Sequence, residues 1–174
     1  MRGLGLILLV GCAGGGARTS VTDSTATVPT SNTTPSSTTE VPTTTEGAPA
    51  ANVVGVRTTG DPGAYDFAVT LRSADTGCEQ YADWWEVVSV ERGLLYRRIL
   101  THSHVDDQPF TRSGGGVGIA EDEEVFVRAH MNPQGYGGVV FGGTVADGFA
   151  RVDAPDGLSP DLEDEAPQPE GCLF

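Results

Sequence analysis

Residues 77–112 read GCEQYADWWEVVSVERGLLYRRILTHSHVDDQPFTR, and this stretch decides the fold. It holds both tryptophans and two of the three histidines of the chain. Residues 84–90 and 94–100 are short and rich in aromatic and β-branched side chains, which is typical of strands. Between them, Gly93 suits the left-handed position at the end of a three-residue loop. The stretch therefore predicts a β-hairpin.

The loop length sets the predicted pairing between these two strands. If Val90 lies opposite Leu94, then Glu86 lies opposite Arg98, and opposite charges meet across the hairpin. We therefore expect an ion pair between Glu86 and Arg98.

Alternating side chains predict further strands on either side of the hairpin. Apolar and polar residues alternate most clearly over residues 65–71 and again over residues 124–131. Residues 52–58 are a weaker candidate, residues 139–145 followed by 148–150 complete the set, and no segment shows a helical period. Six or so short strands in about 100 residues predict an all-β domain, a single antiparallel β-sandwich of the immunoglobulin-like kind. A small barrel is the alternative.

The chain begins MRGLGLILLVGC, where one basic residue precedes a short apolar run that ends in Leu9-Val10-Gly11-Cys12. The run is far shorter than the roughly 20 residues of a membrane-spanning helix. This pattern resembles the signal peptide of bacterial lipoproteins. The resemblance implies cleavage before Cys12, a diacylglyceryl group on its sulfur, and a lipid anchor in the cell membrane, facing the extracytoplasmic side. A buried helix or a plain secretory signal is the alternative.

Composition divides the rest of the chain into three parts. Residues 12–50 are dominated by Ser, Thr and Pro and contain no aromatic residue, so they cannot bury a core. We expect them to be a lipid-anchored, disordered linker that follows a signal peptide of residues 1–11. Residues 51–150 suffice for one β-sandwich domain, and residues 151–174 are predicted to form an acidic tail.

A second resemblance concerns the predicted domain. Residues 77–112, with residues 128–132 and 135–137, resemble a group of secreted or membrane-anchored bacterial proteins. The similarity spans most of residues 65–150 and implies a shared β domain in an exported protein. It brings no known activity, so no functional residue is carried over.

The three cysteines divide between lipid and disulfide. Once Cys12 is assigned to the lipid, Cys78 and Cys172 remain as a pair in an oxidising compartment. We expect a disulfide that ties the acidic tail to the domain, with two free thiols as the alternative.

Charge limits the choice of partners. The chain carries 24 acidic and 10 basic residues, a formal net charge of −14, and none of the basic residues is lysine. Nucleic acid and anionic surfaces are therefore poor partners. The acidic tail is interpreted as a solvated segment, because no calcium-binding loop of the EF-hand type is present.

Two groups of residues are candidates for chemistry. His102 and His104 lie two apart, and His130 lies on a later strand, which is a spacing that zinc and copper sites use. The second group combines aromatic and charged side chains: Trp84, Glu86, Tyr96, Arg98 and Arg128. It predicts either a buried ion-pair network or a cleft for an anionic or sugar-like ligand. Structural histidines and ion pairs are the interpretation that the sequence favours.

Motifs of catalysis are missing from the sequence. It contains no Gly-x-Ser-x-Gly, no His-Glu-x-x-His and no phosphate-binding loop. The run Gly114-Gly115-Gly116 is compatible with a backbone anion nest, although such a run is usually a loop. The sequence thus favours a binding or structural module at the cell envelope over an enzyme. A zinc or copper protein that uses the three histidines is the alternative.

Overall fold

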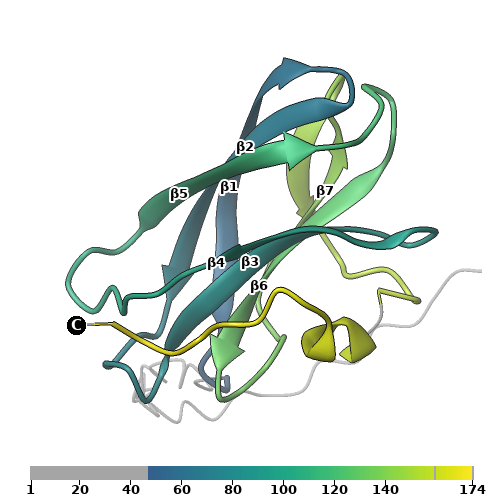
Figure 1. Ribbon diagram of the computed structural model, residues 1–174. Coiled ribbons are helices and arrows are strands. Elements are labelled where there is room, and N and C mark those ends of the chain that lie inside the picture. Colours follow the sequence, from purple (N-terminus) through teal and green to yellow (C-terminus); the bar gives the residue numbers. More distant parts are fainter. Residues whose placement is uncertain (1–46, 159, 174) are drawn as a thin grey trace, which may run out of the picture. The chain divides into compact units, whose positions relative to one another are not determined.

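The computed structural model describes residues 47–158 and 160–173 (Figure 1). The predicted signal peptide, Cys12 and all but the last residues of the predicted linker lie outside the described residues. Eight strands and one short 3-10 helix follow each other: β1 (Ala51–Asp61), β2 (Ala64–Ser73), β3 (Tyr81–Ser89), β4 (Gly93–Ile99), β5 (Phe110–Val117), β6 (Val125–Asn132), β7 (Val140–Thr144), β8 (Gly148–Val152) and η1 (Pro160–Asp164).

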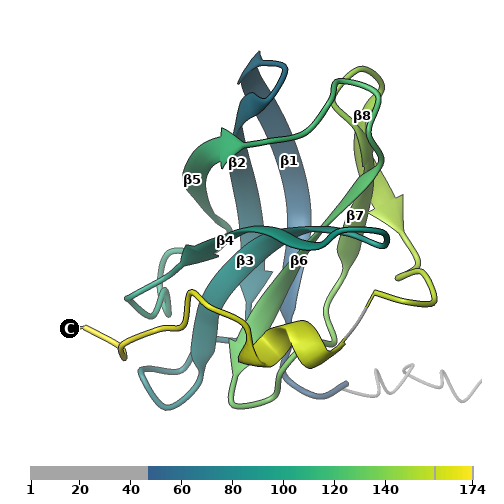
Figure 2. The same ribbon diagram turned by 45° about the vertical axis from the view of Figure 1, so that its right-hand side comes forward.

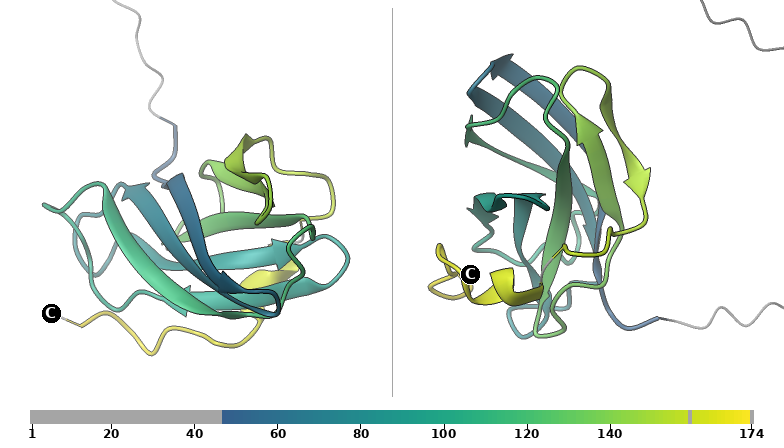
Figure 3. Two further views of the ribbon diagram at one scale, coloured as in Figure 1. Left: turned by 90° about the horizontal axis from the view of Figure 1, so that it is seen from above. Right: turned by 90° about the vertical axis from the view of Figure 1, so that its right-hand side faces the viewer.

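The strands form two antiparallel sheets, ordered β1-β2-β5 and β4-β3-β6-β7-β8 (Figure 3). The inner faces of the two sheets share one hydrophobic core, so the predicted β-sandwich is confirmed. The orders β1-β2-β5 and β4-β3-β6-β7 match strands A-B-E and C′-C-F-G of immunoglobulin-like sandwiches, with β8 added at one edge.

The core is lined by alternate residues of the facing strands. Its largest fully buried side chains include Phe67 and Leu71 of β2, Trp85 of β3 and Met131 of β6. Burying each such side chain stabilises the fold by about 1.5–3 kcal/mol. The alternation predicted over residues 65–71 holds in β2, whose four apolar residues at odd positions are all buried.

Strands β3 and β6 depart from simple alternation because both of their faces are covered. All nine residues of β3 are buried, as are seven of the eight residues of β6. On the side away from the core, the C-terminal segment crosses these strands, with η1 beside β6 (Figure 2). Residues 160–173 are called the strap below, and the sheet surface beneath them, which carries Trp84, Glu86, Arg97, Arg128 and His130, is called the outer face.

The register of the β3–β4 hairpin differs from the prediction. The turn closes between Ser89 and Gly93, and the register shifts between Val87 and Val88, so Glu86 pairs with Arg97. A shift of one residue moves a side chain to the opposite face of its strand. Arg97 is therefore buried beside Glu86 while Arg98 is exposed, and the predicted pairing of Glu86 with Arg98 is wrong by one residue.

Strand β5 was not expected, because the sequence of residues 114–116 is typical of a loop. These glycines lie within β5, where Gly114 pairs with Phe67 of β2. A Cβ atom at Gly114 would collide with the Tyr96 hydroxyl, and one at Gly115 with the Asp66 carboxylate. Close approach of Tyr96 from the other sheet and of Asp66 from the neighbouring strand β2 accounts for the missing side chains.

The C-terminal segment is joined to the sandwich covalently. The structure contains the disulfide predicted between Cys78 and Cys172, which closes a sequence separation of 94 residues. In the chain-entropy model, a loop of this length stabilises the fold by up to about 4.7 kcal/mol.

The residues that the structure describes include no helix of the length and hydrophobicity that a membrane span requires.

Gly138 gives a test of how closely the loop before β7 approaches β1. A Cβ atom at this position would overlap the backbone carbonyl of Ala51, whereas one at Gly137 would meet no atom within 4 Å. We expect Gly138→Ala to lower the free energy of unfolding by about 1–3 kcal/mol, since a main-chain neighbour cannot rotate away. Gly137→Ala is the matched control and should stay within about 0.5 kcal/mol of the parent in urea unfolding. Equal stabilities of the two variants would contradict the close approach of Gly138 to Ala51.

Candidate functional site

The outer face is built around one buried carboxylate. Glu86 of β3 has no exposed surface, and it lies between Arg97 of β4 and Arg128 of β6. Arg97 donates from Nε and Nη2 to Glu86 Oε2 at 2.9 and 2.7 Å, and Arg128 donates from Nε to Oε1 at 2.7 Å. Both carboxylate oxygens therefore accept charge-assisted hydrogen bonds.

Arg97 connects this carboxylate to the strap. Its guanidinium donates hydrogen bonds to the main-chain carbonyl groups of Leu162, Glu165 and Pro167. The same group lies 4.5 Å from the centroid of the Trp84 ring. A cation with two ion-pair bonds, three carbonyl acceptors and an aromatic neighbour is compensated on every side, as burial of a charge requires.

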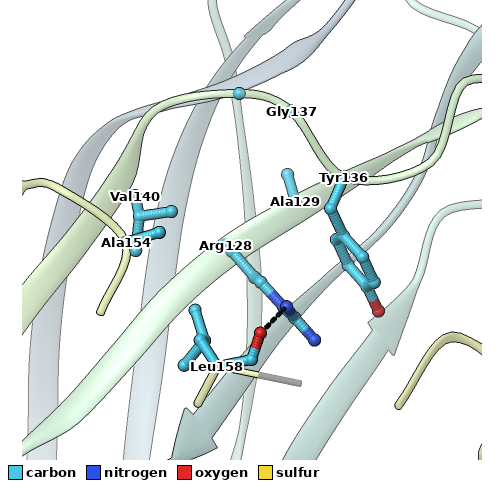
Figure 4. Close-up of a pocket in the computed structure, with 8 residues that line it drawn as sticks. Arg128, Ala129, Tyr136, Gly137, Val140, Ala154 and Leu158 are labelled. Atoms are coloured by element: carbon cyan, nitrogen blue, oxygen red, sulfur yellow. Dashed lines mark hydrogen bonds between the residues drawn. The ribbon is translucent and has the colours of Figure 1, made fainter. Parts of the chain in front are cut away.

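Arg128 has a similar environment at the other side of Glu86. Its guanidinium lies 3.7 Å from the centroid of the Tyr136 ring, and Nη1 donates to the Leu158 carbonyl at 3.4 Å (Figure 4). These residues and Val140 line a hollow of about 340 Å³. That volume is at the lower end of ligand pockets, and the charge of Arg128 is already compensated by Glu86.

Tyr136 contacts both arginines, Arg128 through its ring and Arg97 through its hydroxyl group. It accepts hydrogen bonds from Trp84 Nε1 at 3.3 Å and Arg97 Nη2 at 3.4 Å. Burial and the nearby charge of Glu86 raise the pKa of Tyr136 to about 12. The phenol is therefore neutral at physiological pH and is not a general base there.

His130 extends the network along β6. Its Nδ1 lies 2.7 Å from Asp83 Oδ1, its Nε2 lies 3.0 Å from Glu163 Oε1, and its ring stacks on Trp84 at 3.7 Å. Burial lowers the pKa of His130, but the hydrogen bonds and charges of Asp83 and Glu163 outweigh burial and raise the pKa above 6.5. The protonated ring donates to both carboxylates, so His130 links the sheet to the strap.

His104 belongs to a different cluster. It stacks on Phe110 at 3.7 Å, its main-chain N–H donates to Asp75 Oδ2, and its Nε2 lies 2.6 Å from Arg112 Nη2. Since arginine only donates, Nε2 must be the acceptor and the ring must be neutral. Burial, together with the charge of Arg112, accordingly lowers the pKa of His104.

The structure does not bring the predicted metal ligands together. His102 is exposed and contacts Thr101, whereas His104 and His130 are buried among different partners. Within residues 47–158 and 160–173, no group of three or more His, Cys, Asp or Glu side chains is arranged to hold a metal ion. The expectation of a zinc or copper site is therefore not supported, and each buried histidine has a structural explanation.

The second candidate group is brought together in part. Trp84, Glu86 and Arg128 share the outer face, but Tyr96 packs on the core side against Trp85, with ring centroids 5.5 Å apart. The residues that sequence reasoning missed are Arg97, Asp83, Tyr136 and Glu163. Arg97 was missed through the register error, and Glu163 because nothing in an acidic tail indicates which carboxylate meets a histidine.

Comparisons with known proteins add one relative. A protein of Halomicrobium mukohataei named "Putative lipoprotein" is 43% identical over 90 residues, which cover 51% of this chain and 44% of the relative. The chain thus spans less than half the length of that protein. No family model matches the chain, and no solved structure matches it.

Adjacent arginines of β4 test the role of the buried carboxylate. Arg97→Lys should lower the free energy of unfolding by about 2–4 kcal/mol, since lysine cannot reproduce the paired bonds to Glu86 or reach three carbonyl groups. Arg98→Lys changes an exposed side chain and should remain within about 0.5 kcal/mol. Urea unfolding of the two variants measures the difference. If Arg97→Lys leaves the free energy of unfolding unchanged, the network is dispensable.

The raised pKa of His130 predicts a pH dependence of stability. A histidine whose folded-state pKa lies above its unfolded value contributes its full stabilisation below the unfolded pKa and loses it as the pH rises through the folded pKa. We therefore expect the free energy of unfolding to decline as the pH rises above about 6.5. His130→Gln should remove that decline, while His102→Gln, at an exposed position, should preserve it. An unchanged pH profile in His130→Gln would refute this assignment.

Proposed function

We propose that the chain is an exported lipoprotein of the cell envelope, anchored through Cys12, that displays the β-sandwich beyond the membrane as a binding or structural module. The observation that carries the proposal is Leu9-Val10-Gly11-Cys12 at the end of a short apolar run. The relative named as a lipoprotein supports it, as does the Ser/Thr-rich composition of residues 12–50, which suits a spacer.

The disulfide supports an extracytoplasmic location. Cys78 and Cys172 are bonded in the structure, and disulfides persist in oxidising compartments such as the outer side of the cell membrane. A carboxylate-rich chain without lysine is also suited to stay soluble and unattached to nucleic acid or anionic lipid in that compartment.

The contacts on the outer face favour a structural role for this face of the module. Glu86, Arg97 and Arg128 satisfy one another, and further acceptors come from strap carbonyl groups, the Leu158 carbonyl and the Tyr136 hydroxyl. Among the described residues, this arrangement is explained by stability, because each buried charge has a partner within the chain. The module is thus proposed to be a rigid domain whose partner contacts other surfaces while the strap is in place.

A cysteine comparison tests the anchor. Cys12→Ala should move the protein from the membrane fraction to the soluble fraction and remove the mass of a diacylglyceryl group, because the sulfur that carries the lipid is absent. Cys172→Ala is the matched control, since it removes a cysteine and the disulfide but keeps the lipid attachment residue. Fractionation followed by intact-mass analysis gives both readouts. If Cys12→Ala still sediments fully with membranes, the proposed anchor is wrong.

A further inference from the structure

The strap is attached to the sandwich by few apolar contacts. Leu162 is the one strap residue that is buried among those whose burial the structure describes, and the others are half-buried or exposed. Its acidic side chains also cluster, with Asp161, Glu163, Asp164 and Glu165 within five consecutive residues. Like charges at such spacing repel one another and disfavour compaction.

The groups beneath the strap are of the kinds that bind ligands. Arg97 donates to strap carbonyl groups, and His130 Nε2 meets the Glu163 carboxylate. Trp84 lies between them, stacked on His130 and beneath the Arg97 guanidinium. An arginine, a histidine and a tryptophan on one sheet face are therefore covered by a segment that buries a single apolar side chain.

The disulfide fixes the free end of this cover. Cys172 lies near the end of the strap, and Cys78 lies in the turn that precedes β3. Both cysteines are half-buried, so a small thiol can approach them. At its other end the strap continues the chain from β8, so the disulfide converts a segment tethered at one end into one tethered at both.

We propose that the strap is a redox-controlled cover, which the Cys78–Cys172 disulfide holds closed over Trp84, Arg97 and His130. A dithiol reductant attacks the protein disulfide. The reductant is oxidised to a cyclic disulfide, and the protein disulfide is reduced to two thiols. Two electrons and two protons pass to the protein in this exchange. The strap then opens locally while the two sheets remain folded, because the sandwich core lies on the opposite side of β3 and β6.

Limited proteolysis of the full chain tests this opening. The oxidised protein is compared with protein treated with dithiothreitol, using a glutamate-specific protease. We expect reduction to increase cleavage after Glu163 and Glu165 by about tenfold or more, since a protease requires an opened segment. Cleavage after Glu121 and Glu124, which are exposed in the loop before β6, is the internal control and should not change. Oxidation with diamide should restore protection of the strap.

Two further measurements separate opening from unfolding. Acrylamide quenching of tryptophan fluorescence should increase on reduction, and Trp84→Phe should remove that increase, because Trp85 is fully buried in the core. Amide hydrogen exchange in β2 and β3 should stay unchanged. The proposal is overturned if the strap remains equally protected after reduction, or if β2 and β3 exchange as fast as the strap. Neither result depends on lipidation of Cys12.

Discussion

The buried carboxylate of Glu86 is the constraint on which the rest of the structure depends. Removing a carboxylate from water costs several kcal/mol unless charge and hydrogen bonds replace the lost hydration. Arg97 and Arg128 provide that replacement from the strands on either side of β3. Two arginines against one carboxylate leave an excess of donors, however, and the excess is met by strap carbonyl groups and by aromatic rings.

This requirement explains why a two-sheet sandwich has a third layer. A sheet with an apolar inner face and a wet outer face needs nothing more, as β2 illustrates. In β3 and β6, the outer positions hold tryptophan, charged groups and histidine at low exposure, so another segment must lie over them. The acidic C-terminal residues are therefore part of the domain, and their carbonyl groups matter to the sheet as much as their side chains do.

The fold was largely predictable from residues 65–131, because alternation is a local property that the sequence displays directly. The exceptions have physical causes. The glycines of β5 leave room for the close approach of Tyr96 and Asp66, which no local pattern reveals. Because of the bulge near Val87, Glu86 pairs with Arg97 and not with the predicted Arg98. Contacts such as His130 with Glu163 join distant segments, whereas the Cys78–Cys172 bond was accessible by counting cysteines.

Two-sided burial of β3 has a consequence for the order in which the chain is made. Pairing of β3 with β4 involves neighbours in sequence, and pairing with β6 requires a further thirty or so residues. The cover of the outer face, residues 160–173, follows all eight strands in the chain and is synthesised after them. Until then Glu86, Arg97 and Arg128 are exposed to water, and Cys78 lacks its disulfide partner Cys172. A nascent or truncated chain ending at β8 thus presents a finished core beside an unfinished surface, and exposed apolar surface of this kind makes an incomplete chain prone to aggregation.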